Sequence, residues 1–239
     1  MTTPDRPAGL AGLLRNIAFY TLFYGGSVPL LMINIVTLLL PAGVLFVMVR
    51  VWCGWHWWCC RHVLGIRVVV EGQVPDYPAL FAMRHESFFE AIDLPILLHN
   101  PVVFAKQELF AIPLWGALGR RYGLVTVDRH AGARALKAMF AAARAHSRGA
   151  QRARPLVIFP EGTRVPHGTA APLQAGFAGL YKIMGLPVVP VAVDSGPLYH
   201  RWWKRPGVIT YRFGAEIPAG LPRHAIETAV HDAINALNS

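Results

Sequence analysis

An uncharged segment dominates the amino-terminal part of the chain. From Asn16 to Val49 there is no Asp, Glu, Lys, Arg or His. One membrane-spanning helix needs about 20 apolar residues, so the segment is too long for one straight span and too short for two full ones. A glycine pair and Pro41 interrupt it, and these residue types disfavour helix interiors. The pattern therefore predicts two helices, over residues 12–38 and 42–64, that form a hairpin entering the bilayer.

The composition also indicates contact with lipid. Hydrophobic residues make up 54% of the chain and the mean hydropathy is +0.38, whereas apolar residues account for about 45–50% of typical soluble domains. The tryptophans between Trp52 and Trp58 suit the headgroup level of a bilayer. A helix pair buried against the rest of the chain is the alternative, but the sequence after residue 64 offers no apolar surface that we can match to it. A cleaved signal peptide is disfavoured because its apolar core spans only about 7–15 residues.

The chain is strongly basic, with a formal net charge of +10. The excess concentrates between residues 120 and 164, where a series of Arg and Lys residues faces only Asp128 and Glu161. An anionic membrane would explain both this basic segment and the hairpin. Nucleic acid is not expected as a partner, because no nucleic-acid-binding motif accompanies the charge. Part of the basic segment is also expected to be an ordinary solvated helix face.

The cysteines do not indicate a disulfide framework or a metal site. Cys53, Cys59 and Cys60 all lie in the second predicted helix, where adjacent cysteines rarely pair with each other. His56 and His62 could be grouped with them as metal ligands, but helical spacing scatters these side chains around the helix. We therefore expect no bound metal.

After residue 64 the pattern changes to strands that alternate with helices. Strands are predicted over residues 65–72, 79–84, 102–105, 124–128, 155–160, 188–193 and 207–213. Helices are predicted over residues 87–98, 108–119, 131–147, 172–184 and 222–237. This alternation predicts an α/β fold with a mixed, largely parallel sheet flanked by helices. We expect residues 1–64 to form the membrane-inserted helical hairpin and residues 65–239 to form the α/β domain, with active residues beyond the strand ends.

A histidine with a nearby carboxylate follows the second predicted strand. His85 comes directly after this strand, and Glu90 lies five positions later, within reach across one helical turn. A carboxylate beside an imidazole fixes its tautomer and stabilises the imidazolium that forms when the other nitrogen takes a proton. Glu86 and Asp93 are alternative partners. Ser87 is a weak candidate nucleophile because the G-x-S-x-G elbow is absent.

A second motif follows the strand over residues 155–160. It reads Phe-Pro-Glu-Gly-Thr-Arg and ends at Arg164, whose planar fork of donors matches phosphate geometry. Thr163 and the backbone N–H of Gly162 could add donors. Glu161 is negative, so we expect it to position Arg164 or a hydroxyl group of the substrate rather than to bind an anion. Together the two motifs predict base catalysis beside a bound phosphate.

Four segments in this order resemble the four sequence blocks of the glycerolipid acyltransferase family. The first block, H-x-x-x-x-D, is matched from His85 but with Glu90 in place of Asp. The third, F-P-E-G-T-R, is matched residue for residue. The second and fourth blocks are similar to residues 123–129 and 188–193, the latter a proline inside an apolar strand. The resemblance covers residues 85–193 and says little about the first 60 residues.

The resemblance implies transfer of a fatty acyl group from an acyl thioester to the sn-2 hydroxyl of 1-acyl-glycerol-3-phosphate, forming phosphatidic acid. It implies His85 as base, Glu90 as orienting acid, and a substrate-phosphate site made by Gly162, Thr163, Arg164, Arg129 and Lys106, in which Glu161 positions Arg164 or a substrate hydroxyl. The co-substrate would be acyl-CoA or an acyl carrier protein, with no further cofactor. A bacterial inner membrane would hold the protein, with the catalytic domain on the cytoplasmic side.

Two alternatives remain open at this stage. The acceptor could be another lyso-lipid, such as lyso-ornithine lipid or a lysophospholipid, and Glu90 in place of Asp keeps this alternative open. From a different class, the chain could be a non-catalytic membrane-binding protein with a decayed site. The intact first and third motifs disfavour decay, and release of thiol in the presence of lysophosphatidic acid would exclude it.

Overall fold

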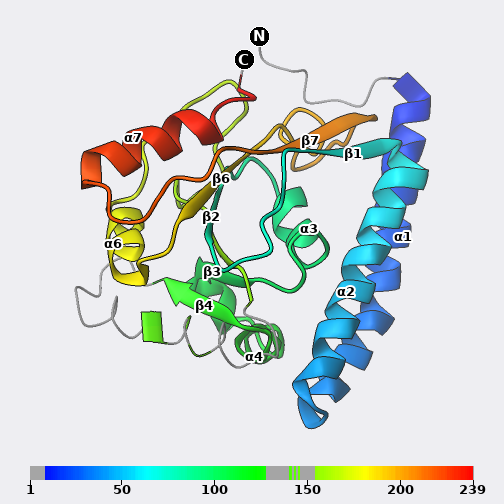
Figure 1. The fold of residues 1–239 in the computed structure, drawn as a ribbon. Coiled ribbons are helices and arrows are strands. Elements are labelled where there is room, and N and C mark those ends of the chain that lie inside the picture. The colour runs from blue at the N-terminus through cyan, green and yellow to red at the C-terminus, as the bar shows by residue number, and fades with distance from the viewer. Residues whose placement is uncertain (1–8, 128–139, 142, 144, 146–153, 239) are drawn as a thin grey trace.

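The computed structural model describes the chain except for residues 1–8, 128–139, 142, 144, 146–153 and 239 (Figure 1). The described strands form one seven-stranded sheet in the order β1-β7-β6-β2-β5-β3-β4. Their bounds are β1 Ile66–Glu71, β2 Leu80–Met83, β3 Val102–Lys106, β4 Leu124–Val127, β5 Leu156–Ile158, β6 Val188–Val193 and β7 Gly207–Phe213. Every neighbouring pair is parallel except β6 and β7. The mixed, largely parallel sheet that the sequence predicts is therefore confirmed.

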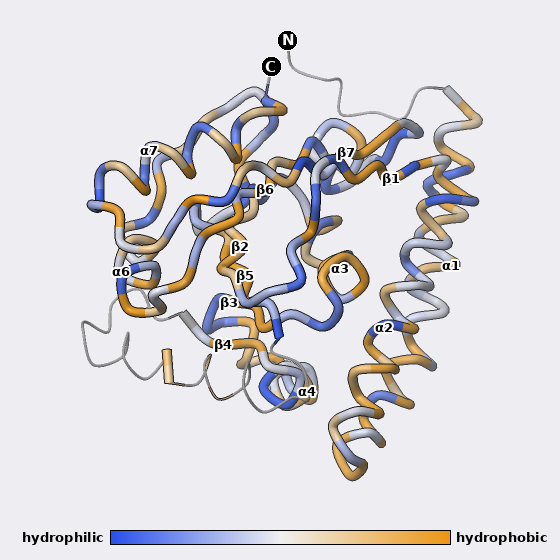
Figure 2. Tube along the Cα trace, in the orientation of Figure 1, coloured by the Kyte–Doolittle hydropathy of each residue, from blue (hydrophilic) through white to orange (hydrophobic). Residues whose placement is uncertain are grey.

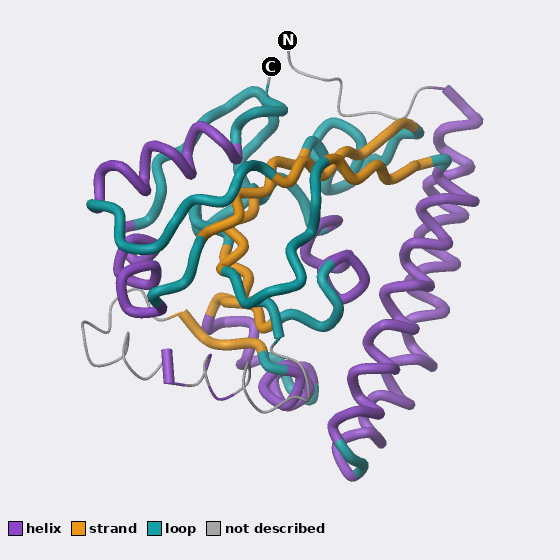
Figure 3. Tube along the Cα trace, viewed as in Figure 1, coloured by secondary structure: helices purple, strands orange, loops and turns teal. Residues whose placement is uncertain are grey.

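Helices cover both faces of this sheet. Because side chains alternate along a strand, Leu80 and Ala82 of β2 join one buried core, whereas Phe81 and Met83 join another. The first core lies under α6 (Ala175–Met184) and α7 (Arg223–Ile234). The second lies under α3 (Phe89–Leu97) and the amino-terminal hairpin. Figure 3 shows the strands between these two helical layers.

The hairpin has the two helices that the apolar segment predicts. They are α1 (Gly9–Val36) and α2 (Ala42–Cys59), joined by a 3₁₀ turn over Thr37–Leu39. Pro41 precedes the first residue of α2, where its missing N–H costs nothing. One π-helical turn over Cys60–Leu64 continues α2 and ends at Gly65, whose φ of 75° favours glycine. Figure 2 shows that apolar residues run along most of both helices.

The hairpin also packs on the α/β domain, so the expectation that no downstream surface matches it was wrong. Phe19 and Leu64 are buried in the same core as Phe89 and Tyr199, which the sequence pattern did not group together. The opposite face remains apolar and open, with Leu39 88% exposed. By length and composition, the helical segment Gly9–Leu39 could cross a membrane, and only 17% of its most apolar window is buried. The hairpin therefore has one face for the domain and another suited to lipid.

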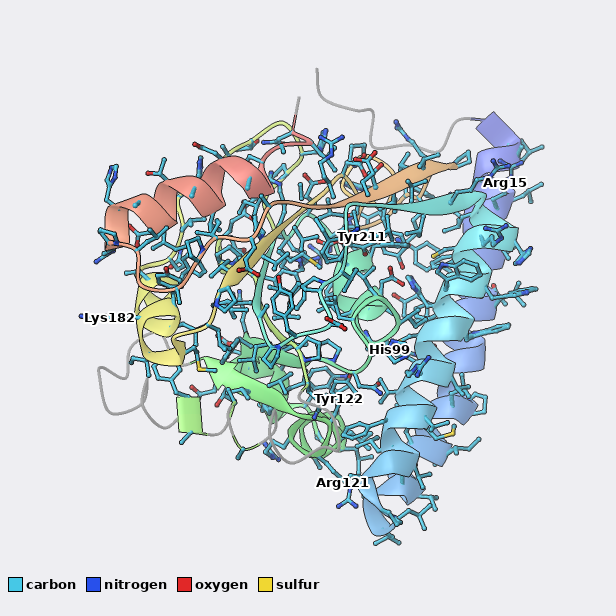
Figure 4. The ribbon with its side chains drawn as sticks, in the orientation of Figure 1. Arg15, His99, Arg121, Tyr122, Lys182 and Tyr211 are labelled. Atoms are coloured by element: carbon cyan, nitrogen blue, oxygen red, sulfur yellow. The ribbon has the colours of Figure 1, made fainter. Side chains whose placement is uncertain are left out.

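One predicted helix is broken in the structure. Residues 108–119 were expected to form a single helix, but they divide between a 3₁₀ turn (Gln107–Ala111) and α4 (Trp115–Tyr122). Pro113 lies at the break because proline cannot continue a helix through its missing N–H, and Leu114 adopts a positive φ of 62°. The carboxyl end of α4 reaches the tip of the hairpin, where Arg121 donates to the carbonyl of Leu40 (Figure 4).

The other helix predictions were close. The helices α3, α6 and α7 lie inside the predicted ranges and begin one to three residues later than predicted. The predicted helix over residues 131–147 falls mostly outside the described residues.

Candidate active site

Loops that follow three neighbouring strands meet at one edge of the sheet. The strand β2 lies between β6 and β5 and is parallel to both. His85 follows β2, Glu161 follows β5 and Ser195 follows β6. Because the carboxyl ends of parallel strands lie on the same side, the three loops converge there, as the sequence predicts for an α/β site.

His85 and Glu90 form a hydrogen-bonded pair. The distance between His85 Nδ1 and Glu90 Oε1 is 2.9 Å, and the Glu90 side chain is fully buried whereas that of His85 is 17% exposed. An ionised carboxylate can only accept, so the proton of this bond belongs to Nδ1. His85 Nε2 then carries a free lone pair and can take a proton from a substrate. The extra methylene of glutamate is thus compatible with the pair.

Four further donors hold the Glu90 carboxylate. Oε1 accepts from the backbone N–H groups of Glu86 at 2.6 Å and Ser87 at 2.7 Å. Oε2 accepts from the hydroxyls of Ser195 at 2.6 Å and Ser87 at 3.0 Å. Burial alone would raise the pKa of Glu90, but the bonds from His85, Ser195 and Ser87 outweigh it and leave this pKa below its ordinary value. Glu90 is therefore ionised at neutral pH.

The two alternative partners of His85, Asp93 and Glu86, lie next to other groups. Asp93 is buried in α3 next to Tyr211, and burial raises its pKa to about 6. The Glu86 carboxylate accepts from His167 Nδ1 at 3.0 Å and from the backbone N–H of Gly196 at 2.9 Å. The geometry thus selects Glu90 from the three carboxylates that the sequence offered.

The third block, residues 159–164, contacts His85 directly. The rings of His85 and Phe159 stack with their centroids 4.2 Å apart and 25° between their planes. The backbone N–H of His85 donates to Glu161 Oε2 at 3.1 Å, and the His85 carbonyl accepts from the N–H of Val165 at 2.7 Å. These contacts fix the loop after β2 relative to the turn after β5.

A buried arginine that no sequence motif singles out lies behind this attachment. Arg84 is 1% exposed and pairs with Glu86 at 3.0 Å and with Glu161 at 2.8 Å. Its other donors reach the carbonyls of Pro166 and Thr169 and the side chains of Asn235 and Asn238. Burial raises the pKa of both Glu86 and Glu161, and Arg84 opposes that rise.

This network changes the role expected for Glu161. Both of its carboxylate oxygens are engaged, one by Arg84 and the other by the backbone of His85. Neither contact is the predicted one to Arg164 or to a substrate hydroxyl. In this structure Glu161 supports the histidine loop.

The predicted phosphate ligands are partly exposed at the same edge. Thr163 and Arg164 are exposed, and Arg164 Cζ lies 4.1 Å from the centre of the Phe88 ring. Such contact uses the face of the guanidinium and leaves its in-plane donors available to an anion. The N–H of Gly162, by contrast, donates to the carbonyl of Phe159 at 2.9 Å. Gly162 has a φ of 69°, so its place in the motif follows from the turn in which its N–H already has a partner.

The remaining predicted ligands are more distant or lie outside the described residues. Lys106 is exposed at the end of β3, and β5 separates β3 from β2 in the sheet. Arg129 lies outside the described residues, as do several other members of the basic segment. Arg154 belongs to that segment but is buried, and it donates to the carbonyls of Asn100, Pro101 and Tyr122. Its role is to hold loops together.

Among the described residues, no group of three His, Cys, Asp or Glu side chains is placed to hold a metal ion. His56, one of the residues that could have been grouped as ligands, is buried with Nε2 2.8 Å from the Tyr199 hydroxyl and 3.4 Å from Cys60 Sγ. This histidine links the hairpin to the domain.

Known proteins share sequence and fold with this chain. The family model described as Acyltransferase matches residues 65–194. A 1-acyl-sn-glycerol-3-phosphate acyltransferase of Pseudomonas aeruginosa is 30% identical over 175 residues, which cover 72% of this chain and 67% of the relative. A lyso-ornithine lipid O-acyltransferase of the same organism is 35% identical over 152 residues, covering 58% of this chain and 52% of the relative.

A solved structure has the same fold. The crystal structure of the 1-acyl-sn-glycerophosphate acyltransferase from Thermotoga maritima matches with a TM-score of 0.61 at 22% identity, covering 95% of this chain and 96% of that one. The residues that the Acyltransferase family model matches include His85, Glu161 and the strand of the fourth block. The chain belongs to the acyltransferase family.

Proposed function

We propose that the protein transfers a fatty acyl group from an acyl thioester to the sn-2 hydroxyl of 1-acyl-glycerol-3-phosphate, forming phosphatidic acid. The observation that carries this proposal is the His85–Glu90 pair at 2.9 Å, attached through Phe159 and Val165 to a turn that presents an exposed arginine. The named activity of the Pseudomonas aeruginosa relative, which is 30% identical, supports the choice of acceptor.

The chemistry follows from the position of the histidine proton. Nδ1 donates to Glu90, so Nε2 takes the proton of the acceptor hydroxyl as its oxygen attacks the thioester carbonyl. The new C–O ester bond forms and the C–S bond breaks. The imidazolium, stabilised by the ionised Glu90, then returns the proton to the leaving thiolate. The attack is direct, without an acyl-enzyme, and Ser87 is unsuited as a nucleophile because its hydroxyl is buried and bonded to Glu90.

Arg164 is the proposed anchor for the acceptor phosphate. Its cationic group lies above Phe88, three residues after the histidine, and Thr163 adds an exposed hydroxyl beside it. Arg129 and Lys106 are further phosphate ligands in this proposal. The thioester is acyl-CoA or an acyl carrier protein, and no other cofactor is required.

In this proposal the hairpin holds the site at a membrane. The open apolar face of Gly9–Leu39 enters the lipid, while the other face packs on the domain that carries the site. We propose that the membrane is a bacterial inner membrane and that the catalytic domain lies on its cytoplasmic side.

The second candidate is acylation of another lyso-lipid. The lyso-ornithine lipid O-acyltransferase relative, 35% identical over 152 residues, favours it. A panel of lysophosphatidic acid, lyso-ornithine lipid and lysophospholipids, each with one acyl thioester and membranes containing the protein, separates the candidates. Highest kcat/KM with lysophosphatidic acid is expected, and turnover of lyso-ornithine lipid alone would reverse the order of the two proposals.

The role of Arg164 provides the sharper test of the acceptor. Loss of a charge-assisted hydrogen bond costs about 1.5–3 kcal/mol, so Arg164→Ala should lower kcat/KM for lysophosphatidic acid by roughly 10–150-fold. A phosphate-free acceptor such as 1-acylglycerol should lose much less. Arg223→Ala, which removes an exposed arginine on α7, is the matched control and should leave both values unchanged. An equal loss for the two acceptors would show that Arg164 is structural.

A further inference from the structure

The longer side chain at position 90 meets a serine from the next strand. Glu90 Oε2 lies 2.6 Å from the hydroxyl oxygen of Ser195, which is completely buried. O–H···O⁻ bonds of 2.5–2.7 Å are typical of charge-assisted pairs, which are roughly twice as strong as neutral ones. Ser195 follows β6, outside the four blocks, and no motif in the sequence singles it out.

Ser87 makes a longer contact with the same oxygen. Its hydroxyl lies 3.0 Å from Glu90 Oε2 and 2.8 Å from the hydroxyl of Ser195, and it also accepts from the N–H of Phe89 at 3.0 Å. A serine hydroxyl has one proton, so Ser87 can serve either Glu90 or Ser195 at one time. Ser195 therefore provides the closer hydroxyl donor to this oxygen.

The contact depends on the length of glutamate. An aspartate at position 90, which is the residue in the family block, carries its carboxylate about 1.5 Å closer to the backbone. A withdrawal of that size along the side chain removes a 2.6 Å bond to Ser195 unless the backbone moves. The hydrogen bond from Ser195 therefore requires glutamate, and not aspartate, at position 90.

Ser195 itself is held on both sides. The preceding residue, Asp194, accepts from the N–H of Thr210 on β7 at 2.7 Å. The Ser195 carbonyl accepts from the N–H of Tyr199 at 2.8 Å, and the Tyr199 hydroxyl lies 2.8 Å from His56 Nε2 in α2. A group fixed in this way can hold a catalytic side chain within the narrow limits that proton transfer requires.

We propose that Ser195 is a positioning residue, whose hydroxyl holds the Glu90 carboxylate where Oε1 meets His85. This inference rests on the proposed role of His85 and Glu90 as the catalytic pair. It explains how the chain uses glutamate at a position where the family block has aspartate. Ser195 is completely buried and its hydroxyl contacts Glu90 and Ser87, so it acts through Glu90.

The test is a double-mutant cycle on kcat and KM. The parent, Ser195→Ala, Glu90→Asp and the double variant are assayed in membranes with one acyl thioester and the acceptor that gives the highest turnover. Because a hydrogen bond to a charged group is lost, Ser195→Ala should lower kcat about tenfold or more with KM for the acceptor within about twofold. In the Glu90→Asp background, where the contact is already lost, Ser195→Ala should change kcat less than about twofold.

Each outcome of the cycle decides the proposal. Equal losses in both backgrounds would mean that Ser195 acts through packing alone, and no loss in either would mean that it is not needed; both overturn the inference. Ser27→Ala is the matched control, because it removes a serine hydroxyl that donates to the carbonyl of Phe23 in α1, away from Glu90, and it should retain the parent kcat. A loss like that of Ser195→Ala would mean that the effect is not specific to the contact with Glu90, and would overturn the inference.

His85→Ala separates this inference from the proposed function. If His85→Ala abolishes turnover while the cycle shows no coupling, only the role of Ser195 is refuted. If His85→Ala retains turnover, the catalytic pair itself is refuted and the inference fails with it.

Discussion

Replacing Arg84 by methionine should destabilise the protein in a pH-dependent manner. Arg84 is 1% exposed and lies 3.0 Å from Glu86 and 2.8 Å from Glu161, whose side chains are fully buried. Removing one partner of a buried ion pair typically costs 3–5 kcal/mol, because the other charge stays buried and unpaired. Here two carboxylates lose the same cation, so we expect a loss of about 4–5 kcal/mol at pH 8.

The pH dependence follows from the carboxylate pKa values. Burial already raises the pKa of Glu86 and Glu161, with Arg84 opposing it, so Arg84→Met should raise both further. When the pKa of a carboxyl is higher in the folded state than in the unfolded state, the carboxyl destabilises the fold at pH values above its folded pKa. At pH values below its unfolded pKa it has no such effect. The loss should therefore be largest at pH 8 and smaller at pH 5.

Thermal unfolding in detergent, followed by tryptophan fluorescence, measures this effect. A chain of this size changes Tm by about 2–4 °C per kcal/mol, so the drop at pH 8 should be roughly 8–20 °C. Arg223→Met is the control, because its pair with Glu227 is on the surface and should matter little. A drop of less than about 4 °C at pH 8, or the same drop at both pH values, would refute the reasoning.

Three further predictions concern the catalytic pair, the hairpin and a buried acid. His85→Ala should lower the chemical step by about 10²–10⁴-fold, and Glu90→Gln should also lower kcat because the imidazolium loses its counter-charge; a silent Glu90→Gln would exclude Glu90 as the orienting acid. Washing membranes with carbonate or high salt should leave the full-length protein in the pellet, and its release would refute insertion of the hairpin. The pKa of Asp93 is about 6 in the folded protein, above its ordinary 3.8, so stability should fall as pH rises from about 4 to about 6. Asp93→Asn should remove this dependence and raise stability by up to about 3 kcal/mol at pH 8 but little at pH 4, and equal Tm changes at both pH values would contradict this.

The sequence predicts the parts of this protein that depend on local pattern. Strand positions and the two hairpin helices follow from hydrophobic runs and from Pro41, which are signals of local structure within short windows of sequence. The His85–Glu90 pair is also local, because five residues separate its members across one loop and one helical turn. The break at Pro113 could have been predicted from the sequence as well, since proline ends helices wherever its ring falls in their interior.

The parts that the sequence missed depend on long-range packing. The partners of Arg84 include Glu161 and Asn235, which are 77 and 151 residues away along the chain, and no periodic pattern connects them. Ser195 meets Glu90 only because β6 lies next to β2 in the sheet. No local sequence pattern indicates either contact. The contact between Tyr199 and His56 is likewise long-range. It shows that His56, which could have been grouped as a metal ligand, instead links the hairpin to the domain.

The bonds between Arg84 and the residues after α7 set an order of assembly during synthesis. Translation produces the hairpin before the sheet, and domains generally fold from the amino terminus as they emerge, so the membrane can receive α1 and α2 before the sheet exists. Arg84 obtains its Asn235 and Asn238 partners only after residues 235–238 have left the ribosome. The catalytic loop should therefore be completed after the sheet, on a chain already held at the membrane. A nascent chain stalled before Asn235 should be membrane-bound yet inactive.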